Sequence, residues 1–477
     1  MKYEQLTIIE LHNLYVSKKT TPLKVVEYLI ELIKNDEHNF MEANMFEDAI
    51  KFAKNIGEVE KDNLLWGVPF LIKDNIATKG VITSASSKIL SNYVSPFDAT
   101  MIKKLRVLKA IPLGKTTMDE FAMGGKGTTS HNGFTYNPLD KTKTKIMGGS
   151  SSGSAAAVTA PVVPFALASD TGDSIRKPAS YGGIVGFKPS WGRISRYGLF
   201  SFAPSMDHAG YFTRSVIDAA VLLEALAGHD ENDPTSSKNN VEEYTKNLTN
   251  SNPKYQIAVI KGIIDNVLDE NLKTLFNKSI KELKALGHEV EVVDMPLTLL
   301  RAIFPTYFVI SCAEASSNTA CFDGVNFGLR LKGDTYEEIV ARTRSELFSL
   351  QIKKRIIFGA YALAKENKNE AYLRAQRSRR KIVKYINNLF IKYHFIYLPA
   401  APSVAPAFNE QNDDDNFAIA DNHLAIANFG GYPSITIPLG EIMGLPLGVN
   451  FTGRPFEEKS LFNIAYQLEQ ITKRKGV

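Results

Sequence analysis

Cysteine is nearly absent from this sequence, with Cys312 and Cys321 the only two among 477 residues. That scarcity argues against a disulfide framework and a cysteine-based zinc site, and it fits a reducing cytoplasm. No group of histidine and carboxylate residues has a convincing metal-ligand spacing, so we expect no metal site. Both thiols are expected to be inert side chains in a helical region.

Charge of one sign and long hydrophobic runs are also lacking. The 56 Lys and Arg residues exceed the 51 Asp and Glu residues by five, too few to mark a nucleic-acid-binding protein. The N-terminal "MKYEQLTIIELHN" carries acidic residues where a signal peptide needs an apolar core. The least polar run, residues 155–169, is short and interrupted by proline. We therefore expect a soluble cytoplasmic protein with no membrane segment.

What the sequence does contain is an alternation of helical and strand-like patterns. Residues 5–56 have helical periodicity, with Thr21 and Pro22 as a helix start, so a helical region is predicted over about 1–60. A second helical, charged region is predicted over about 335–392, and a polar surface connection over 228–254. Buried strands are predicted at 68–72, 110–114, 162–169, 183–190, 255–260, 288–294, 394–400, 432–440 and 447–453. Together these patterns predict an α/β protein, one domain over 1–477, with a large sheet covered by helices on both faces.

Three motifs point to other functions but are incomplete. "LGKTT" (113–117) resembles half of a phosphate-binding loop, but Lys109 stands where the first glycine is required. "GSSSG" (149–153) matches a nucleophile elbow, but a polar stretch precedes it instead of a strand, so a Ser-His-Asp hydrolase stays a weak alternative. The basic stretch 371–386 could contact RNA phosphates, although a solvated helix face explains it equally well.

A more specific arrangement surrounds "SDTGDSIRKPASYGG" (169–183), which follows an apolar strand. The turn Thr171-Gly172-Asp173 can direct consecutive backbone N–H groups at one point, which creates an oxyanion-binding nest. Ser174, at the end of this turn, would place a hydroxyl beside that nest. This pairing is what an acyl-transfer site requires.

A serine nucleophile needs a base, and no histidine is well placed to serve. Lys73 ends the apolar run "GVPFLIK", where burial would favour its neutral form. Ser150, in "GGSSSGSAAAVTA" (148–160), would relay the proton between Ser174 and Lys73. The small residues after it would let their helix pack close to the sheet. Each element alone has a simpler explanation, but the three together predict a catalytic site.

These elements resemble the amidase signature family, whose Ser–cis-Ser–Lys triad matches Lys73, Ser150 and Ser174. The family pattern around the cis serine, Gly-Gly-Ser-Ser-Gly-Gly-Ser, corresponds to GGSSSGS here, and the nucleophile turn Thr-Gly-Gly-Ser-Ile-Arg corresponds to TGDSIR. The resemblance extends from "GVPFLIKDN" to "GLPLGVNFTGRPFEEKSL", nearly the whole chain. It implies the amidase signature fold, with backbone amides of Thr171, Gly172 and Asp173 as the oxyanion hole.

Within this family the chain is most similar to the A subunits of aspartyl/glutamyl-tRNA amidotransferases. Segments such as "GKTTMDEFAMGG" (114–125), "GFKPSWGRISRYGLFSFAPSMDHAG" (186–210) and "EASSNTACFDGVNFG" (314–328) carry this closer match. The resemblance implies a translation enzyme that acts as a heterotrimer with B and C subunits. This chain would hydrolyse L-glutamine and hold no cofactor. The B subunit would bind misacylated tRNA, ATP and Mg²⁺, and would convert Glu-tRNA(Gln) or Asp-tRNA(Asn) with the ammonia.

The same resemblance implies a pocket for the two charged groups of glutamine. Arg355 would bind the α-carboxylate, where a forked guanidinium suits it, and Asp421 would bind the α-amino group. Tyr307, Met123 and Gly124 would line the pocket.

Two residues depart from the family pattern. Asp173 replaces a glycine of the nucleophile turn, and its carboxylate could repel a developing oxyanion unless it faces away. Lys126 stands near the expected substrate entrance, where a small polar residue is usual.

Two other functions remain open at this stage. A free-standing amidase acting on a small amide would share the triad but would not need the charge pair Arg355 and Asp421. A catalytically silent scaffold is favoured only by Asp173, and the intact Lys-Ser-Ser set argues against it.

Overall fold

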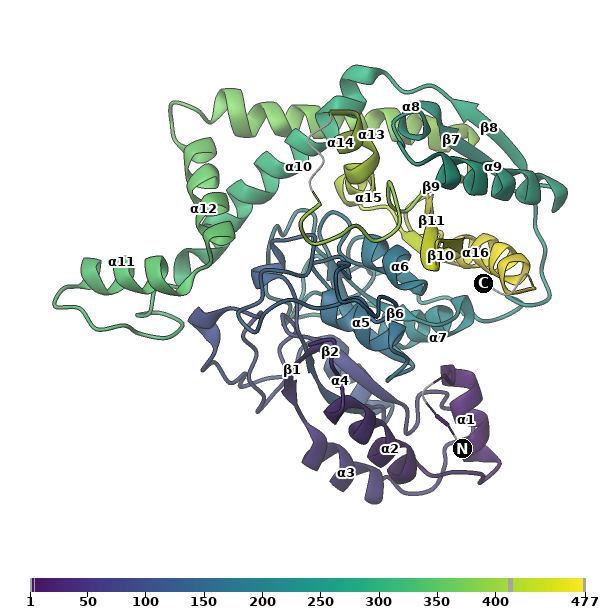
Figure 1. The fold of residues 1–477 in the computed structure, drawn as a ribbon, viewed down its shortest axis with the longest axis horizontal. Helices are drawn as coiled ribbons and strands as arrows, with labels where there is room; N and C mark the ends of the chain where they lie inside the picture. Colours follow the sequence, from purple (N-terminus) through teal and green to yellow (C-terminus); the bar gives the residue numbers. More distant parts are fainter. Residues whose placement is uncertain (1, 4, 411–414, 475–477) are drawn as a thin grey trace.

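The chain folds around one twisted sheet of 11 strands (Figure 1), seen in a computed structural model that describes residues 2–3, 5–410 and 415–474. The strand order is β1-β3-β2-β4-β6-β5-β10-β11-β9-β7-β8. The strands are β1 Met41–Asn44, β2 Pro69–Lys73, β3 Ile111–Thr116, β4 Phe165–Asp170, β5 Val185–Lys188, β6 His208–Thr213, β7 Gln256–Ile260, β8 Glu289–Val293, β9 Phe395–Pro399, β10 Ser434–Ile442 and β11 Leu445–Gly453.

Sixteen α-helices within the described residues accompany the sheet. They are α1 Ile8–Val16, α2 Pro22–Lys34, α3 Phe46–Lys54, α4 Thr100–Val107, α5 Ser152–Thr159, α6 Arg176–Gly182, α7 Val216–Leu226, α8 Lys261–Ile264, α9 Glu270–Ala285, α10 Leu297–Asn318, α11 Tyr336–Leu347, α12 Leu350–Leu363, α13 Arg374–Lys392, α14 Asp415–Asn422, α15 Ala425–Gly430 and α16 Glu458–Arg474. Thr21 caps α2 and Pro22 is its first residue, which confirms that predicted start.

The sheet is mixed, with parallel pairing near each edge and antiparallel pairing in the middle. β3, β2 and β4 are parallel, as are β9, β7 and β8, whereas β4, β6, β5, β10, β11 and β9 pair antiparallel. Strands from both halves of the sequence join in one sheet. This continuity supports the proposal of a single domain, whose outermost residues, 1 and 475–477, lie outside the described part.

All nine predicted strands are present, but two others were missed. β1 (Met41–Asn44) lies inside the stretch predicted as purely helical, and β6 (His208–Thr213) lies between β4 and β5. The prediction that all strands are buried was wrong for β8, an edge strand in which Glu289 and Glu291 are exposed. The helical prediction over 335–392 is confirmed by α11, α12 and α13.

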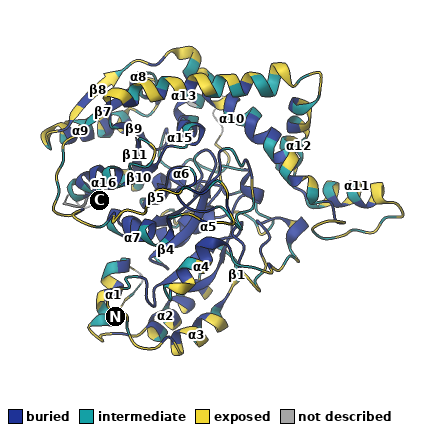
Figure 2. Cartoon of the chain, turned by 180° about the vertical axis from the view of Figure 1, so that it is seen from behind, coloured by how far each residue is buried: buried dark blue, intermediate teal, exposed yellow. Residues whose placement is uncertain are grey.

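Helices cover both faces of the sheet, as two successive residues of β5 that point to opposite faces show. A Cβ at Gly186 would lie 2.6 Å from the Ala179 Cβ of α6, so this position faces α6. The next residue, Phe187, instead packs against Phe462 of α16, with ring centroids 4.6 Å apart. Successive strand residues point to opposite faces, so α6 and α16 lie on opposite sides. The central strands are buried between these layers (Figure 2).

The small residues of α5 allow this helix to approach the sheet closely. All eight residues of Ser152–Thr159 are buried, and α5 contacts β2, β3, β4 and β6. A Cβ on Gly153 would lie 2.6 Å from the carbonyl oxygen of Thr117. Because such an approach excludes larger side chains, the sequence "SGSAAAVT" sets the position of the loop before it, which carries Ser150.

The polar segment 228–254 contains no helix or strand among its residues, but it is more than a surface connection. Tyr244 and Leu248 are buried, and Asp230 accepts hydrogen bonds from the hydroxyls of Thr100 and Ser195. This polar segment therefore packs against the sheet domain through selected side chains.

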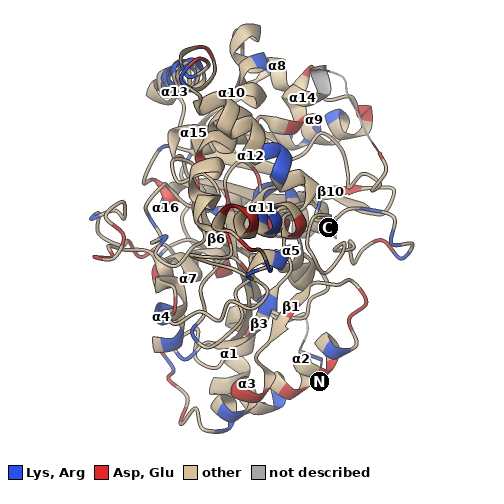
Figure 3. Cartoon of the chain, turned by 90° about the vertical axis from the view of Figure 1, so that its left-hand side faces the viewer, with Lys and Arg blue, Asp and Glu red and all other residues tan. Residues whose placement is uncertain are grey.

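Helix α10, with 22 residues, is longer than the apolar run 155–169 of the sequence analysis. Residues 297–321 are long and apolar enough, by composition alone, to cross a membrane. In this structure α10 packs against α12, α13 and α14. Helix α13, rich in Lys and Arg (Figure 3), buries Ala375, Ile382 and Ile386 and exposes its basic residues except Arg379, which donates hydrogen bonds to Ser205 and to the carbonyl oxygen of Phe429.

Candidate active site

Lys73 is fully buried at the end of β2, and its amino group is surrounded by oxygen atoms. Nζ lies 2.8 Å from the hydroxyl of Ser150, 2.7 Å from that of Ser151 and 2.9 Å from that of Ser169. Burial lowers the pKa of Lys73 to about 7, although the nearby carboxylates of Asp119, Asp170 and Asp207 oppose this shift. A lysine with such a pKa can exchange a proton near neutral pH.

Ser150 and Ser174 are both buried, but they are not hydrogen-bonded to each other. The peptide bond between Gly149 and Ser150 is cis, as the resemblance implied. Ser150 contacts Lys73 through its hydroxyl. Among the described residues, the hydroxyl of Ser174 forms no hydrogen bond to Ser150. The predicted relay therefore has its Lys73–Ser150 contact in place, while the contact to Ser174 stays a prediction.

The turn before Ser174 is fixed by a buried ion pair. Arg176, fully buried, donates from Nε to Asp170 Oδ2 at 3.1 Å and from Nη2 to Asp170 Oδ1 at 2.9 Å. Its Nη2 also donates to the carbonyl oxygen of Gly172 at 2.7 Å and to Asn428 Oδ1 at 2.7 Å. These contacts hold the start and the middle of the turn together.

The N–H groups of this turn are free to bind a ligand. None of the backbone N–H groups from Thr171 to Ser174 donates a hydrogen bond within the described chain, whereas the next one, of Ile175, donates to Asp170. Tyr307 of α10 lies over the turn, so that a Cβ on Gly172 would be 2.8 Å from its ring. Consecutive free N–H groups form a nest suited to an oxyanion.

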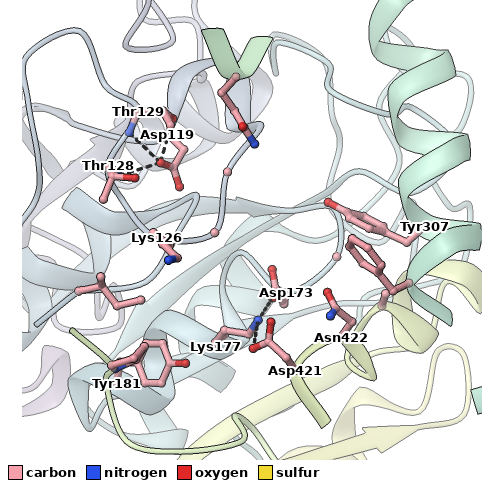
Figure 4. A pocket seen from close by; sticks show the side chains of 18 of the residues that line it. Asp119, Lys126, Thr128, Thr129, Asp173, Lys177, Tyr181, Tyr307, Asp421 and Asn422 are labelled. Atoms are coloured by element: carbon pink, nitrogen blue, oxygen red, sulfur yellow. Dashed lines mark hydrogen bonds and ion pairs between the residues drawn. The ribbon is translucent and has the colours of Figure 1, made fainter. Parts of the chain in front are cut away.

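A cavity of about 650 Å³ opens beside this turn (Figure 4). Its wall includes Gly172 and Asp173, so the cavity reaches the residues directly before Ser174. Tyr307, Arg355, Asp421 and Gly124 also line it, as the resemblance implied. Met123 does not line it, because its side chain is fully buried in the apolar core. The contact of Met123 with the substrate stays a prediction.

Arg355 has hydrogen-bonding capacity to spare. Its Nε and Nη1 atoms are buried without a hydrogen-bond partner in the described structure. The guanidinium carbon lies 5.6 Å from the ring centroids of both Phe202 and Phe308, so the cation contacts two aromatic faces. Unpaired buried donors are costly, so this arrangement is suited to binding an anionic group in the cavity.

Asp421, on α14, is not free in this structure. Lys177 Nζ lies 2.9 Å from Asp421 Oδ1 and 2.6 Å from Asp173 Oδ2, so one ammonium group joins the two carboxylates (Figure 4). Burial opposes the charge on Lys177, but Asp173 and Asp421 outweigh it and raise the pKa of Lys177. Asp173 thus directs its carboxylate toward a cation.

The loop on the opposite side of the cavity is organised by Asp119. Its carboxylate accepts hydrogen bonds from the backbone N–H groups of Gly127, Thr128 and Thr129, at 2.9–3.1 Å. A Cβ on Gly124 would lie 2.3 Å from Asp119 Cγ, which explains the glycine. Lys126 is exposed on this loop, as expected for a residue near the entrance, and it donates to the carbonyl oxygen of Glu410.

The sequence matches the family model described as Amidase over residues 24–462. The chain belongs to the amidase family. It is 39% identical to the A subunit of the glutamyl-tRNA(Gln) amidotransferase of Staphylococcus saprophyticus, over 98% of this chain and 97% of the relative. The corresponding A subunit of Macrococcus caseolyticus is also 39% identical, over 99% and 98%.

Solved structures agree with this assignment. The crystal structure of the glutamyl-tRNA(Gln) amidotransferase A subunit of Thermotoga maritima has a TM-score of 0.81 and 35% identity, and the similarity covers 98% of this chain and 95% of that one. The peptide amidase of Stenotrophomonas maltophilia has a TM-score of 0.79 and 26% identity, over 98% and 97%. The predicted amidase signature fold is therefore confirmed.

Several residues of the site were not predicted from the sequence. The hydroxyls of Ser151 and Ser169 contact Lys73, and Asp119 holds the loop that faces the cavity. Lys177 could have been found from its spacing, because it follows Asp173 by four positions, and the structure places it at the start of α6. Opposite charges with that spacing lie on the same helix face.

Proposed function

We propose that this chain is the glutaminase subunit of a tRNA-dependent amidotransferase that converts Glu-tRNA(Gln) to Gln-tRNA(Gln). The supporting observation is that one cavity joins the nest before Ser174 to a guanidinium group with unpaired donors, Arg355. A carboxylate, Asp421, lines the same cavity. Glutamine carries an amide, an α-carboxylate and an α-ammonium group, and these features can receive each of them. The full-length similarity to glutamyl-tRNA(Gln) amidotransferase A subunits supports the same substrate.

The reaction begins when Ser174 Oγ attacks the side-chain amide carbon of glutamine. The negative charge that develops on the carbonyl oxygen is stabilised by the N–H groups of Thr171, Gly172 and Asp173. The Ser174 proton passes through Ser150 to neutral Lys73, and the same route then protonates the leaving nitrogen. The C–N bond breaks to release ammonia and leaves a glutamyl ester on Ser174. Water cleaves this ester, which releases glutamate and restores the hydroxyl group.

The ammonia would be consumed by a partner. In this proposal the B subunit holds misacylated tRNA, ATP and Mg²⁺ and forms the new amide, while the C subunit stabilises the A–B contact in a cytoplasmic heterotrimer. This chain needs no cofactor for its own step, since the base and the oxyanion donors are protein groups. Asp-tRNA(Asn) is the second acceptor that the proposal allows.

Ammonia release from L-glutamine tests the proposal. It is measured for the chain alone and with the B and C subunits, ATP and misacylated tRNA. We expect release to increase strongly with the complete set and to disappear in Ser174→Ala, whose circular dichroism and melting temperature should match those of the wild type. If the chain alone hydrolyses simple amides but never glutamine, a free-standing amidase is the correct function.

A further inference from the structure

The ion-paired residues Asp173, Lys177 and Asp421 form a chain of three charges along one wall of the cavity (Figure 4). One end, Asp173, belongs to the turn before Ser174. The other end, Asp421, lies on α14, which comes from a distant part of the sequence. Lys177, at the second position of α6, lies between them and is 6% exposed. These three charged residues therefore connect the end of the cavity beside Ser174 with the end where the substrate's α-ammonium group would bind.

We propose that Lys177 is a positioning residue that neutralises Asp173 beside the oxyanion nest and at the same time sets the charge presented to the substrate's α-ammonium group. The inference rests on the proposed glutaminase function and extends it to residues outside the triad and the direct substrate contacts.

The first part of the argument concerns the nucleophile turn. An unpaired carboxylate at position 173 would oppose negative charge on the oxyanion, since like charges in a partly desolvated site interact strongly. The Lys177 ammonium group lies 2.6 Å from Asp173 Oδ2, and Lys177 follows Asp173 in the sequence by four residues, about one turn of a helix. Lys177 thus fixes the carboxylate on the α6 side and cancels its charge.

The second part concerns the balance of charge. The two carboxylates and one ammonium group of Asp173, Asp421 and Lys177 together carry one net negative charge, which attracts the ammonium group of the substrate. If Asp173 were neutral, Lys177 would form an ion pair with Asp421 alone, and the net charge of these three residues would be zero. Asp173 therefore keeps Asp421 available for the substrate even though Lys177 contacts it. This accounts for the presence of both Asp173 and Lys177 in the same wall of the cavity.

Four forms of the full-length chain, assembled with the B and C subunits, test the inference. They are the wild type, Asp173→Asn, Lys177→Gln and the double variant, which keeps an amide pair of similar size without the charges. Lys246→Gln, which removes an exposed ion pair with Glu243, is the matched control. Each form is assayed with L-glutamine and with glutaramate, which is glutamine without its α-amino group.

We expect Asp173→Asn to raise KM for glutamine about tenfold while the KM for glutaramate stays within about twofold, because only glutamine has the ammonium group. Lys177→Gln should lower kcat for both substrates by about tenfold or more, since Asp173 is left without its cation. The double variant should recover most of both losses. A double variant as slow as Lys177→Gln, or equal KM changes for the two substrates in Asp173→Asn, would overturn the inference.

A labelling rate separates this inference from the proposed function. A fluorophosphonate reacts with an activated serine and places a phosphoryl oxygen in the oxyanion nest, so it reports on Ser174 without any amide substrate. Lys177→Gln should slow labelling about tenfold, and the double variant should restore it. If the wild type does not hydrolyse glutamine but this pattern holds, the proposed function fails and the role of Lys177 stands. If all four forms are labelled at the same rate, the role of Lys177 is refuted.

Discussion

The amino group of Lys73 donates a hydrogen bond to the hydroxyl of Ser150, 2.8 Å away, although 77 positions separate the two residues in the sequence. Lys73 ends a buried strand, and Ser150 follows a glycine pair at the start of a helix built from small residues. The close approach of α5 to the sheet creates this contact. It places a buried amine and a hydroxyl where proton transfer to a nearby nucleophile is possible.

The protonation of Lys73 should control the pH dependence of hydrolysis. Burial lowers its pKa to about 7, and only the neutral amine can accept the Ser174 proton. We therefore expect kcat/KM for glutamine to rise with pH up to a plateau above about 7, and Lys73→Ala to lower kcat about 10²–10⁴-fold. The measurement is ammonia release between pH 6 and pH 9. A profile that is flat across this range would assign the base to another residue.

Arg355 should determine affinity for the α-carboxylate of glutamine. Its Nε and Nη1 have no hydrogen-bond partner among the described residues, so a bound carboxylate would form charge-assisted hydrogen bonds there. Arg355→Met should raise KM for glutamine by roughly 10- to 100-fold, because hydrogen bonds to charged groups contribute about 1.5–3 kcal/mol each. The KM for 4-aminobutanamide, which lacks the carboxylate, is the control. An equal rise for both amides would show that Arg355 acts by shaping the cavity.

Gly172 should not tolerate a side chain. A Cβ there would lie 2.8 Å from the ring of Tyr307, a distance that forces either the ring or the turn to move. Gly172→Ala should therefore reduce kcat at least about tenfold through a displaced oxyanion nest. Gly125→Ala is the matched control, since Gly125 lines the same cavity and, its chain neighbours aside, no described atom lies within 4 Å of its Cβ position. Wild-type activity in Gly172→Ala would mean that this turn does not hold the oxyanion.

The Asp170–Arg176 pair should stabilise the whole fold. Burial alone would raise the pKa of Asp170, but Arg176 outweighs it and holds that pKa well below its usual range. Asp170→Asn leaves Arg176 buried without its counter-ion and should lower the free energy of unfolding by about 3–5 kcal/mol. Urea unfolding measures this, with Glu243→Gln of the exposed pair as the control. A loss as small as in the control would mean that Arg176 finds another partner.

The pH dependence of that stabilisation has a defined sign. A carboxyl group whose pKa is lower in the folded chain stabilises the fold at pH values above its unfolded pKa, which is about 4. The wild type should therefore begin to lose this contribution as the pH falls below about 4, and should lose it fully only below the lower folded pKa, whereas Asp170→Asn should not change in this way. The difference between the free energies of unfolding of the two forms should be constant from pH 7 to about pH 4 and should begin to narrow between pH 4 and pH 3. A difference that does not narrow there would contradict the assignment.

The sequence by itself determined the elements and the chemistry of the candidate triad. Apolar runs of strand length between helical stretches predicted the α/β sheet, and nine strands were found where those runs lie. The stretches around Lys73, Ser150 and Ser174 carry their signal locally, in the order of glycines, hydroxyls and an apolar strand before a lysine. Such short motifs are visible without knowledge of the fold.

Only the tertiary structure decided which distant groups meet. β1 and β6 were missed because one is a short edge strand without an apolar pattern and the other lies in a segment rich in turns. The contact of Lys177 with Asp421 spans 244 positions and depends on how α6 and α14 meet at the cavity. The charge on Asp173, which the sequence alone presented as an obstacle to catalysis, acquires its partner in the same way. Electrostatic effects act through space, so a sequence shows which charges exist while the fold determines which of them cancel.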